Sequence, residues 1–202
     1  GAGFGASSVG GEATFRSHIA GPLLPGAEHV APFHCYHCAY GHPGPETCGL
    51  ACAKMVEFAL EREGDVAAVI AEPMRAVPVV PPPGYWQAVQ KACHKHGALL
   101  IMDEIPTGLG KTGEMFAFDH DDIQPDIVVL GKALGGGMPI GALVSSEAHM
   151  KEFTYEPMLG HITTFGGHPV VCAAAAACLD VLGSEIDYNE VERLAGLLAD
   201  RV

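Results

Sequence analysis

The sequence has few basic residues. Lysine and arginine number 11 against 24 aspartates and glutamates, which gives a net charge of −13 with histidine neutral. Nucleic acids and anionic membrane surfaces attract basic patches, so a partner of either kind is not expected. A small anionic ligand can still be held by helix ends and a few donors, and the acidic balance leaves that class of ligand open.

Long hydrophobic runs and a leader pattern are missing as well. The longest apolar stretch, residues 170–179, is rich in alanine and too short to cross a membrane. Residues 1–11 are small and glycine-rich, without a basic start followed by an apolar block, so no signal peptide is predicted. The seven cysteines are an odd number spread through apolar segments, which favours reduced thiols in a cytoplasmic protein.

Strand and helix patterns alternate along most of the chain. Four continuous apolar runs predict strands covered on both faces, at residues 66–71, 98–102, 127–130 and 140–144. Helical patterns separate or follow them, at residues 50–63, 85–95 and 169–182. The alternation predicts an α/β fold with a largely parallel, twisted sheet flanked by helices.

The last segment reads as an amphipathic helix. It begins near Asp187, with Glu190 placed as in a capping box, and is expected to bury Val191, Leu194 and Leu198. The pattern reaches the last residue without a glycine or proline stop, and the first residue is not methionine. We therefore expect residues 1–202 to form one partial domain, truncated at both ends, of a longer polypeptide.

Charged residues follow three of the predicted strands directly. Glu72, Asp103 and Lys132 come at or just after the ends of these apolar runs. Because parallel sheets bind ligands at the carboxyl ends of their strands, the three groups are expected to gather at one edge. Taken singly, each also fits an ordinary wet loop after a strand.

Lysine and aspartate in these positions indicate a particular chemistry. Lys132 is flanked by Gly131 and by glycines at 135–137, where backbone can approach a bulky ligand closely. A desolvated lysine forms a Schiff base with a carbonyl compound. A carboxylate such as Asp103 is what pyridoxal phosphate needs at its ring nitrogen. Alone, Lys132 would fit a solvated loop lysine and Asp103 a helix cap.

A phosphate-binding loop is a competing interpretation of residues 108–112, GLGKT. That motif requires a glycine five residues before Gly110, and the residue there is Ile105. The preceding apolar run also ends too early. The sequence therefore does not support a P-loop.

A longer stretch carries a family resemblance. Residues 101–145, IMDEIPTGLGKTGEMFAFDHDDIQPDIVVLGKALGGGMPIGALVS, resemble the signature region of the class III, or omega, aminotransferases. The resemblance extends back through AEP at residues 71–73 and forward through HITTFGGHP at residues 161–169. These aminotransferases are fold-type I pyridoxal-phosphate enzymes. The resemblance implies that the chain covers most of their large domain, with the small domain absent.

What the resemblance implies can be placed on single residues. Lys132 matches the lysine that forms the Schiff base and moves the proton, Asp103 the partner of the ring nitrogen, and Ile105 the apolar residue on one ring face. The expected reaction is transamination between an amine or amino acid and a keto acid. An aminomutase, decarboxylase or racemase on the same scaffold would use the same cofactor residues and stays open.

Other positions match the family less uniformly. Thr164 matches the threonine that reaches the cofactor phosphate of the neighbouring subunit, so a homodimer is implied. Glu72 and Glu104 match acidic positions that help to arrange the cofactor site. Pro106 replaces a glutamine that contacts the cofactor, and His168 replaces an asparagine. With parts of the site lying outside residues 1–202, this segment alone is expected to be inactive.

A cysteine cluster supports a different class of function. Two pairs with CxxC and CxxxC spacing could supply four thiolates to a structural zinc ion: Cys35, Cys38, Cys48 and Cys52. The protein would then be a non-catalytic, zinc-stabilised module or an inactive fragment. Cys52 falls on a predicted helix, where a small apolar residue suits core packing. We therefore expect no metal and treat these thiols as reduced and non-ligating.

Overall fold

The computed structural model of the chain describes residues 3–16, 21, 23–75, 79–156, 158 and 161–201. They belong to two compact units, Gly1–Pro32 and Phe33–Val202, and each unit is described by itself.

The first unit contains a short helix, α1 (Phe4–Val9), and a 3-10 turn, η1 (Ala13–Phe15). The Ser8 hydroxyl donates to the carbonyl of Phe4 at 2.8 Å and accepts from the amide of Leu24 at 3.0 Å. The first bond lies within the helix, and the second attaches Leu24 to it.

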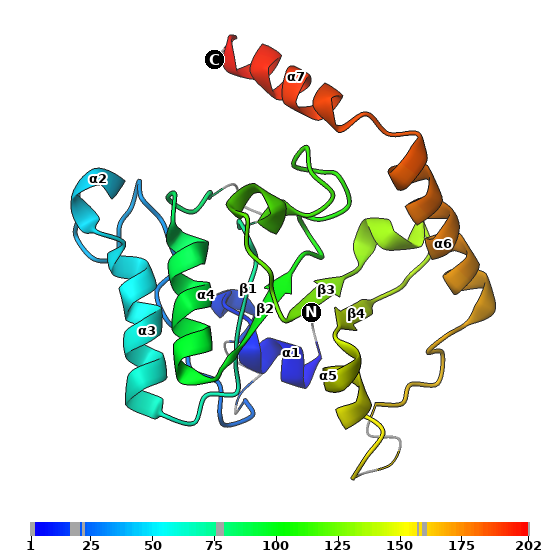
Figure 1. The fold of residues 1–202 in the computed structure, drawn as a ribbon, viewed down its shortest axis with the longest axis horizontal. Helices are drawn as coiled ribbons and strands as arrows, with labels where there is room; N and C mark the ends of the chain where they lie inside the picture. The colour runs from blue at the N-terminus through cyan, green and yellow to red at the C-terminus, as the bar shows by residue number, and fades with distance from the viewer. Residues whose placement is uncertain are drawn as a thin grey trace. The chain divides into compact units, whose positions relative to one another are not determined.

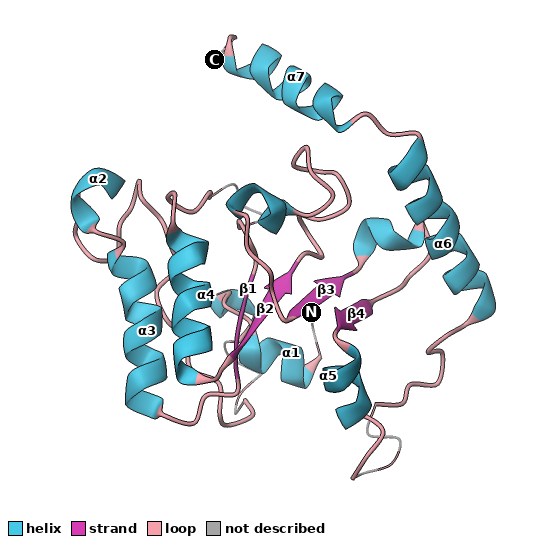
Figure 2. Cartoon of the chain, viewed as in Figure 1, coloured by secondary structure: helices cyan, strands magenta, loops and turns pink. Residues whose placement is uncertain are grey.

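A four-stranded sheet lies at the centre of the second unit (Figure 2). Its strands are β1 (Ala68–Ala71), β2 (Leu99–Asp103), β3 (Ile127–Leu130) and β4 (Ala142–Ser145), in the order β1-β2-β3-β4. The first three are parallel, and β4 runs antiparallel to β3. The predicted α/β fold with a largely parallel sheet is confirmed, and all four predicted strands are present.

Helices and 3-10 turns precede, connect and follow the strands: α2 (Pro45–Cys48), α3 (Ala51–Glu63), α4 (Tyr85–His96), η3 (Ala117–Asp121), η4 (Lys132–Gly135), α5 (Glu147–Glu152), α6 (Pro169–Ser184) and α7 (Tyr188–Ala199). Helices α3 and α4 lie side by side, and α4 packs on β2 (Figure 1). Gly97 ends α4 with a left-handed φ of 72°, a conformation that glycine adopts without strain. The predicted helices are all present, with ends shifted by a few residues.

The main core lies between α3, α4 and one face of the sheet. Leu100 and Met102 of β2 are fully buried against Trp86 and Val89 of α4 and their neighbours. The residues that alternate with them in β2 are only half-buried. A smaller cluster joins α6 to the segment after β3, through Leu130, Leu134, Ala175 and Leu109.

The expectation that the strands are covered on both faces is wrong for the residues that the structure describes. Ile70 of β1 is 41% exposed and Val144 of β4 is 52% exposed. Leu194 and Leu198 of α7, expected to be buried, are 48% and 68% exposed. An apolar pattern predicts that one face of an element favours burial, but it does not identify the residues that pack against that face.

No single helix in the described ranges is long and apolar enough to cross a membrane. Helices α6 and α7 together reach that length and composition, but they are bent by 73° at the break between them.

Trp86 ties the core to the end of β1. Its ring is fully buried, and its Nε1 donates to the buried carbonyl of Pro73 at 2.7 Å. We expect Trp86→Phe to lower the free energy of unfolding by about 1–3 kcal/mol, because the carbonyl loses its donor while most of the ring packing is kept. Urea unfolding measures this. Tyr155→Phe, which alters an exposed side chain, is the control, with an expected change within about 0.5 kcal/mol. Equal stability of the two variants would contradict the prediction.

Candidate active site

Three charged residues lie at one edge of the sheet. The parallel strands β1, β2 and β3 are neighbours, with Ala71 paired to Met102 and Asp103 paired to Val129. Glu72 follows β1, Asp103 ends β2, and Lys132 comes two residues after β3. Adjacent parallel strands end on the same side, so the topology places all three at the carboxyl edge, where open α/β sheets bind ligands.

Lys132 has an unusual backbone conformation. Its φ of 46° lies in the left-handed region, which costs a non-glycine residue on the order of 1 kcal/mol. The surrounding turn holds it there: the amide of Leu134 donates to the carbonyl of Gly131 at 3.0 Å. On the next residue, the carbonyl of Ala133 accepts from Cys178 Sγ of α6 at 3.3 Å. The exposed Lys132 side chain therefore stands on a backbone held from both the turn and a helix.

Ile105 connects Asp103 to the lysine turn. Asp103 Oδ1 accepts from the amide of Ile105 at 3.1 Å. A Cβ placed on Gly131 would lie 3.5 Å from both Cγ1 and Cγ2 of Ile105, which is ordinary packing distance. Gly131 itself is buried. The carboxylate, the branched apolar side chain and the lysine turn therefore form one cluster.

Glu104 is placed differently from Asp103. Its side chain is 1% exposed, and its carboxylate binds residues of its own loop. Oε2 accepts from the Thr107 hydroxyl at 2.5 Å, and Oε1 accepts from the amide of Phe118 at 3.0 Å. Burial raises the pKa of this carboxyl, and the hydrogen bonds from Thr107 and Phe118 oppose that rise. A role for Glu104 in arranging the cofactor site stays a prediction.

The remaining predicted residues lie outside this contact cluster. Glu72 is half-buried between β1 and the buried Pro73. Thr164 lies in an exposed turn between Thr163 and Gly167. Their predicted roles stay predictions.

Sequence reasoning missed Thr107 and Gly108, which pack against Glu104, and Cys178, which contacts the lysine turn from α6. The alternation of side chains along β2 could have indicated the contacts of Thr107 and Gly108 with Glu104. Glu104 continues the buried face of β2, so its carboxylate needed nearby donors.

The cysteine cluster shows no metal-binding geometry. Cys35, Cys38, Cys48 and Cys52 are all free thiols. Burial is the largest cause that raises the pKa of Cys35 and of Cys52, and neighbouring thiols of the cluster also raise it. Within the ranges that the structure describes, no three histidine, cysteine, aspartate or glutamate side chains are arranged to hold a metal ion. The zinc-module alternative therefore gains no support from the geometry.

The cluster at the sheet edge fits pyridoxal phosphate. An amine on Lys132, a carboxylate on Asp103 and an apolar side chain on Ile105 are the groups that this cofactor requires. Gly131, beside them, lacks a side chain that would fill the space next to the lysine. Together with the sheet topology, these groups define the class of fold-type I, lysine-bound cofactor proteins, which the similar structures also represent.

Comparisons identify the family within this class. The family model for class III aminotransferases matches residues 1–202. The structure is similar to an ornithine aminotransferase from Toxoplasma gondii, with 33% identity and a TM-score of 0.81 over 99% of this chain and 42% of that chain. It is also similar to an (S)-enantioselective omega-transaminase from Thermomicrobium roseum, with 36% identity and a TM-score of 0.82 over 92% of this chain and 42% of that one.

A third similar structure is the omega transaminase from Pseudomonas jessenii in complex with PMP. It has 35% identity and a TM-score of 0.81, over 92% of this chain and 43% of that chain. The chain belongs to the class III aminotransferase family. It spans less than half the length of these relatives.

Proposed function

We propose that this chain forms part of the large, cofactor-binding domain of a pyridoxal-phosphate-dependent aminotransferase. The protein would move an amino group between an amine or amino acid and a keto acid. One observation carries the proposal. Asp103 ends β2, Lys132 follows the neighbouring strand β3, and Ile105 lies between them, because its amide donates to Asp103 and its side chain packs beside Gly131. Family membership and the similar transaminase structures support it.

The residues divide the work of the site. When bound, pyridoxal phosphate supplies an aldehyde carbon and a ring that accepts electrons from the substrate. The Lys132 amine would hold the cofactor and, when it is free, would move a proton at its Nζ. The Asp103 carboxylate holds a proton on the ring nitrogen. Ile105 packs on the ring and excludes water from that face.

Borohydride trapping tests the proposal on the full protein. Pyridoxal phosphate is added, the link to lysine is reduced, and peptides are mapped by mass spectrometry. We expect a single phosphopyridoxyl adduct on Lys132. Adducts scattered over the lysines at 91, 111 and 151, or no adduct, would contradict the proposed function.

We also propose that the protein acts as a homodimer in which Thr164 serves the site of the other subunit. The exposed turn that carries Thr164 supports this, because an exposed residue is accessible to a second copy of the chain. Thr164→Val is expected to weaken pyridoxal phosphate binding about tenfold, by removing one donor to the phosphate.

Mixing two variants with different defects, at limiting cofactor, tests the shared site. Lys132→Ala lacks the amine, and Thr164→Val is poorly loaded at limiting cofactor. In a mixed dimer, Lys132 of one subunit meets Thr164 of the other and restores one site of two. Statistical mixing then recovers about a quarter of wild-type activity, since about half the dimers are mixed. Each variant mixed only with itself is the control, and a mixture no more active than its parents would rule out sharing.

A further inference from the structure

Glu104 continues the buried face of β2 beyond the end of the strand. Leu100 and Met102 are fully buried on that face, and Glu104, two residues further on, is 1% exposed. Its amide donates to the carbonyl of Val129 at 3.0 Å, so pairing with β3 continues through this residue. Side chains of a strand alternate between faces, and the Glu104 carboxylate therefore points away from the side that carries Asp103.

The Glu104 carboxylate ties two distant parts of one loop together. Thr107, which is 5% exposed, donates its hydroxyl to Oε2 at 2.5 Å. Eleven residues after Thr107, at the start of η3, the amide of Phe118 donates to Oε1 at 3.0 Å. The Glu104 carbonyl also accepts from the amide of Gly108 at 2.9 Å. One residue thus holds both ends of the segment that runs from Thr107 to Phe118.

The packing around this carboxylate leaves little freedom. A Cβ added to Gly108 would lie 3.0 Å from the Glu104 carbonyl oxygen and 3.1 Å from the Glu104 Cβ, which is tighter than most real contacts, so these atoms would have to move by a few tenths of an ångström. A buried carboxylate is costly to desolvate, and its cost is offset only when its oxygens are hydrogen-bonded. The Thr107 and Phe118 bonds are therefore needed to keep Glu104 in this position.

Asp103 and Ile105 are attached to Glu104 on either side. Asp103 Oδ1 accepts from the Ile105 amide, a bond that spans the Glu104 residue, and Ile105 packs beside Gly131. A rotation of the backbone at Glu104 would move both side chains away from the lysine turn. The orientation of the site depends on how firmly this single residue is held.

We propose that Glu104 is a positioning residue, which acts through its bonds to Thr107 and Phe118 to hold Asp103 and Ile105 toward the cofactor. It would not touch the cofactor itself. This inference rests on the proposed function and specifies how the same site is kept in shape.

Thr107→Val in the full protein is the main test. Valine keeps the shape of threonine but leaves one buried carboxylate oxygen without its donor. We expect the dissociation constant for pyridoxal phosphate, measured by absorbance titration, to rise about tenfold. At saturating cofactor, the pH midpoint of its absorbance change should move upward. The reason is that a less well oriented Asp103 would hold the proton on the ring nitrogen less firmly. A less positive ring withdraws less electron density from Lys132 Nζ, so this nitrogen would keep its own proton to a higher pH.

Glu104→Gln separates geometry from charge. The amide oxygen of glutamine can accept from the Phe118 amide while its nitrogen donates to the Thr107 hydroxyl. Both hydrogen bonds of residue 104 are then kept without the negative charge. Cofactor affinity is expected to stay within about twofold of wild type. A loss equal to that of Thr107→Val would show that the charge acts on the cofactor, which would overturn the positioning role.

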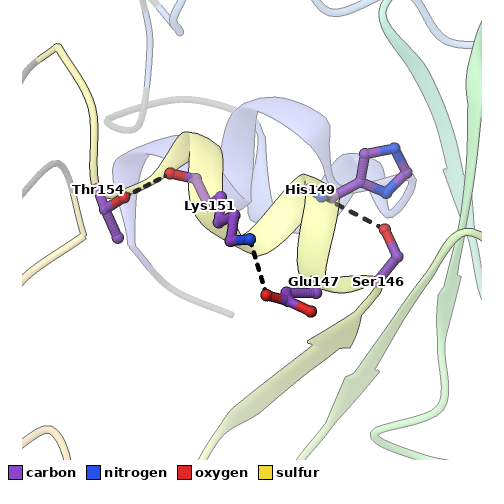
Figure 3. A network of polar contacts seen from close by, with 5 residues as sticks. All are labelled: Ser146, Glu147, His149, Lys151 and Thr154. Carbon is purple, nitrogen blue, oxygen red and sulfur yellow. Dashed lines mark hydrogen bonds and ion pairs between the residues drawn. The ribbon is translucent and has the colours of Figure 1, made fainter.

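A matched control removes another threonine hydroxyl. Thr154, just after α5, donates to the carbonyl of Lys151 at 2.7 Å in an exposed network with the Glu147–Lys151 ion pair (Figure 3). Thr154→Val should leave both the affinity and the pH midpoint unchanged. If wild type takes up no pyridoxal phosphate, the proposed function fails. If wild type binds it and Thr107→Val matches wild type in both readouts, the positioning role alone is wrong.

Discussion

Replacing Lys132 with alanine is expected to lower the rate of amino transfer by about 10⁴-fold or more. Two contributions are lost together, because the same amine holds the cofactor and moves the proton. The fold sets the position of this amine, because Lys132 stands at the edge where β3 ends, on a turn held by Gly131 and by Cys178. Borohydride trapping of the variant should yield no adduct at this position.

Steady-state rates of the purified variant measure the loss. Lys151→Ala is the control, because Lys151 forms an exposed ion pair with Glu147 on α5 and takes no part in the proposed site. That variant should keep wild-type activity and wild-type trapping at Lys132. Activity of Lys132→Ala within about tenfold of wild type would assign the cofactor amine to another residue, because general acid–base catalysis alone contributes more than that.

Asp103→Asn is expected to lower the same rate by about 10²–10³-fold, while the protein stays folded. Asparagine keeps the shape of aspartate, and its side-chain oxygen can still accept from the Ile105 amide. It has no negative charge, so the ring nitrogen loses its proton more readily and the ring accepts electrons less well. The defect should therefore fall on kcat, with a smaller effect on cofactor affinity.

Asp65→Asn is a suitable control for Asp103→Asn. Asp65 is exposed between α3 and β1, away from the residues of the site, and its replacement should leave kcat unchanged. Circular dichroism and the melting temperature show whether Asp103→Asn is folded. A folded Asp103→Asn with wild-type kcat would remove Asp103 from the proposed mechanism.

The sheet was predictable because its signals are local. An apolar run followed at once by a charged residue predicts β2 and the site position of Asp103, and a similar run followed by Gly131 and then Lys132 predicts β3 and the position of the lysine. Parallel neighbours then bring their ends together without any knowledge of side-chain contacts. The long sequence resemblance then assigned an expected role to each of these positions.

Other features depend on contacts between distant residues and were not predictable. The bonds of Glu104 to Phe118, and of Cys178 to Ala133, join residues far apart in the sequence. Exposure of Leu198 on α7 was also missed. Amphipathic spacing reports a face that favours burial, whereas the accessible area depends on which other residues reach that face.

The antiparallel strand β4 limits how the amine of Lys132 can move. Leu130 of β3 is paired with Ala142 of β4, so the segment that carries Lys132 leaves one strand and returns directly to its neighbour. Both ends of this connection, residues 131–141, are anchored by the pairing of β3 with β4, and Lys132 lies only two residues from the anchored end of β3. The travel of the nitrogen between cofactor and substrate must come from rotation about side-chain bonds, which takes picoseconds to nanoseconds in exposed side chains. In the proposed mechanism, proton delivery by Lys132 would therefore be a rotation of one flexible side chain, with no opening or closing of the turn that supports it.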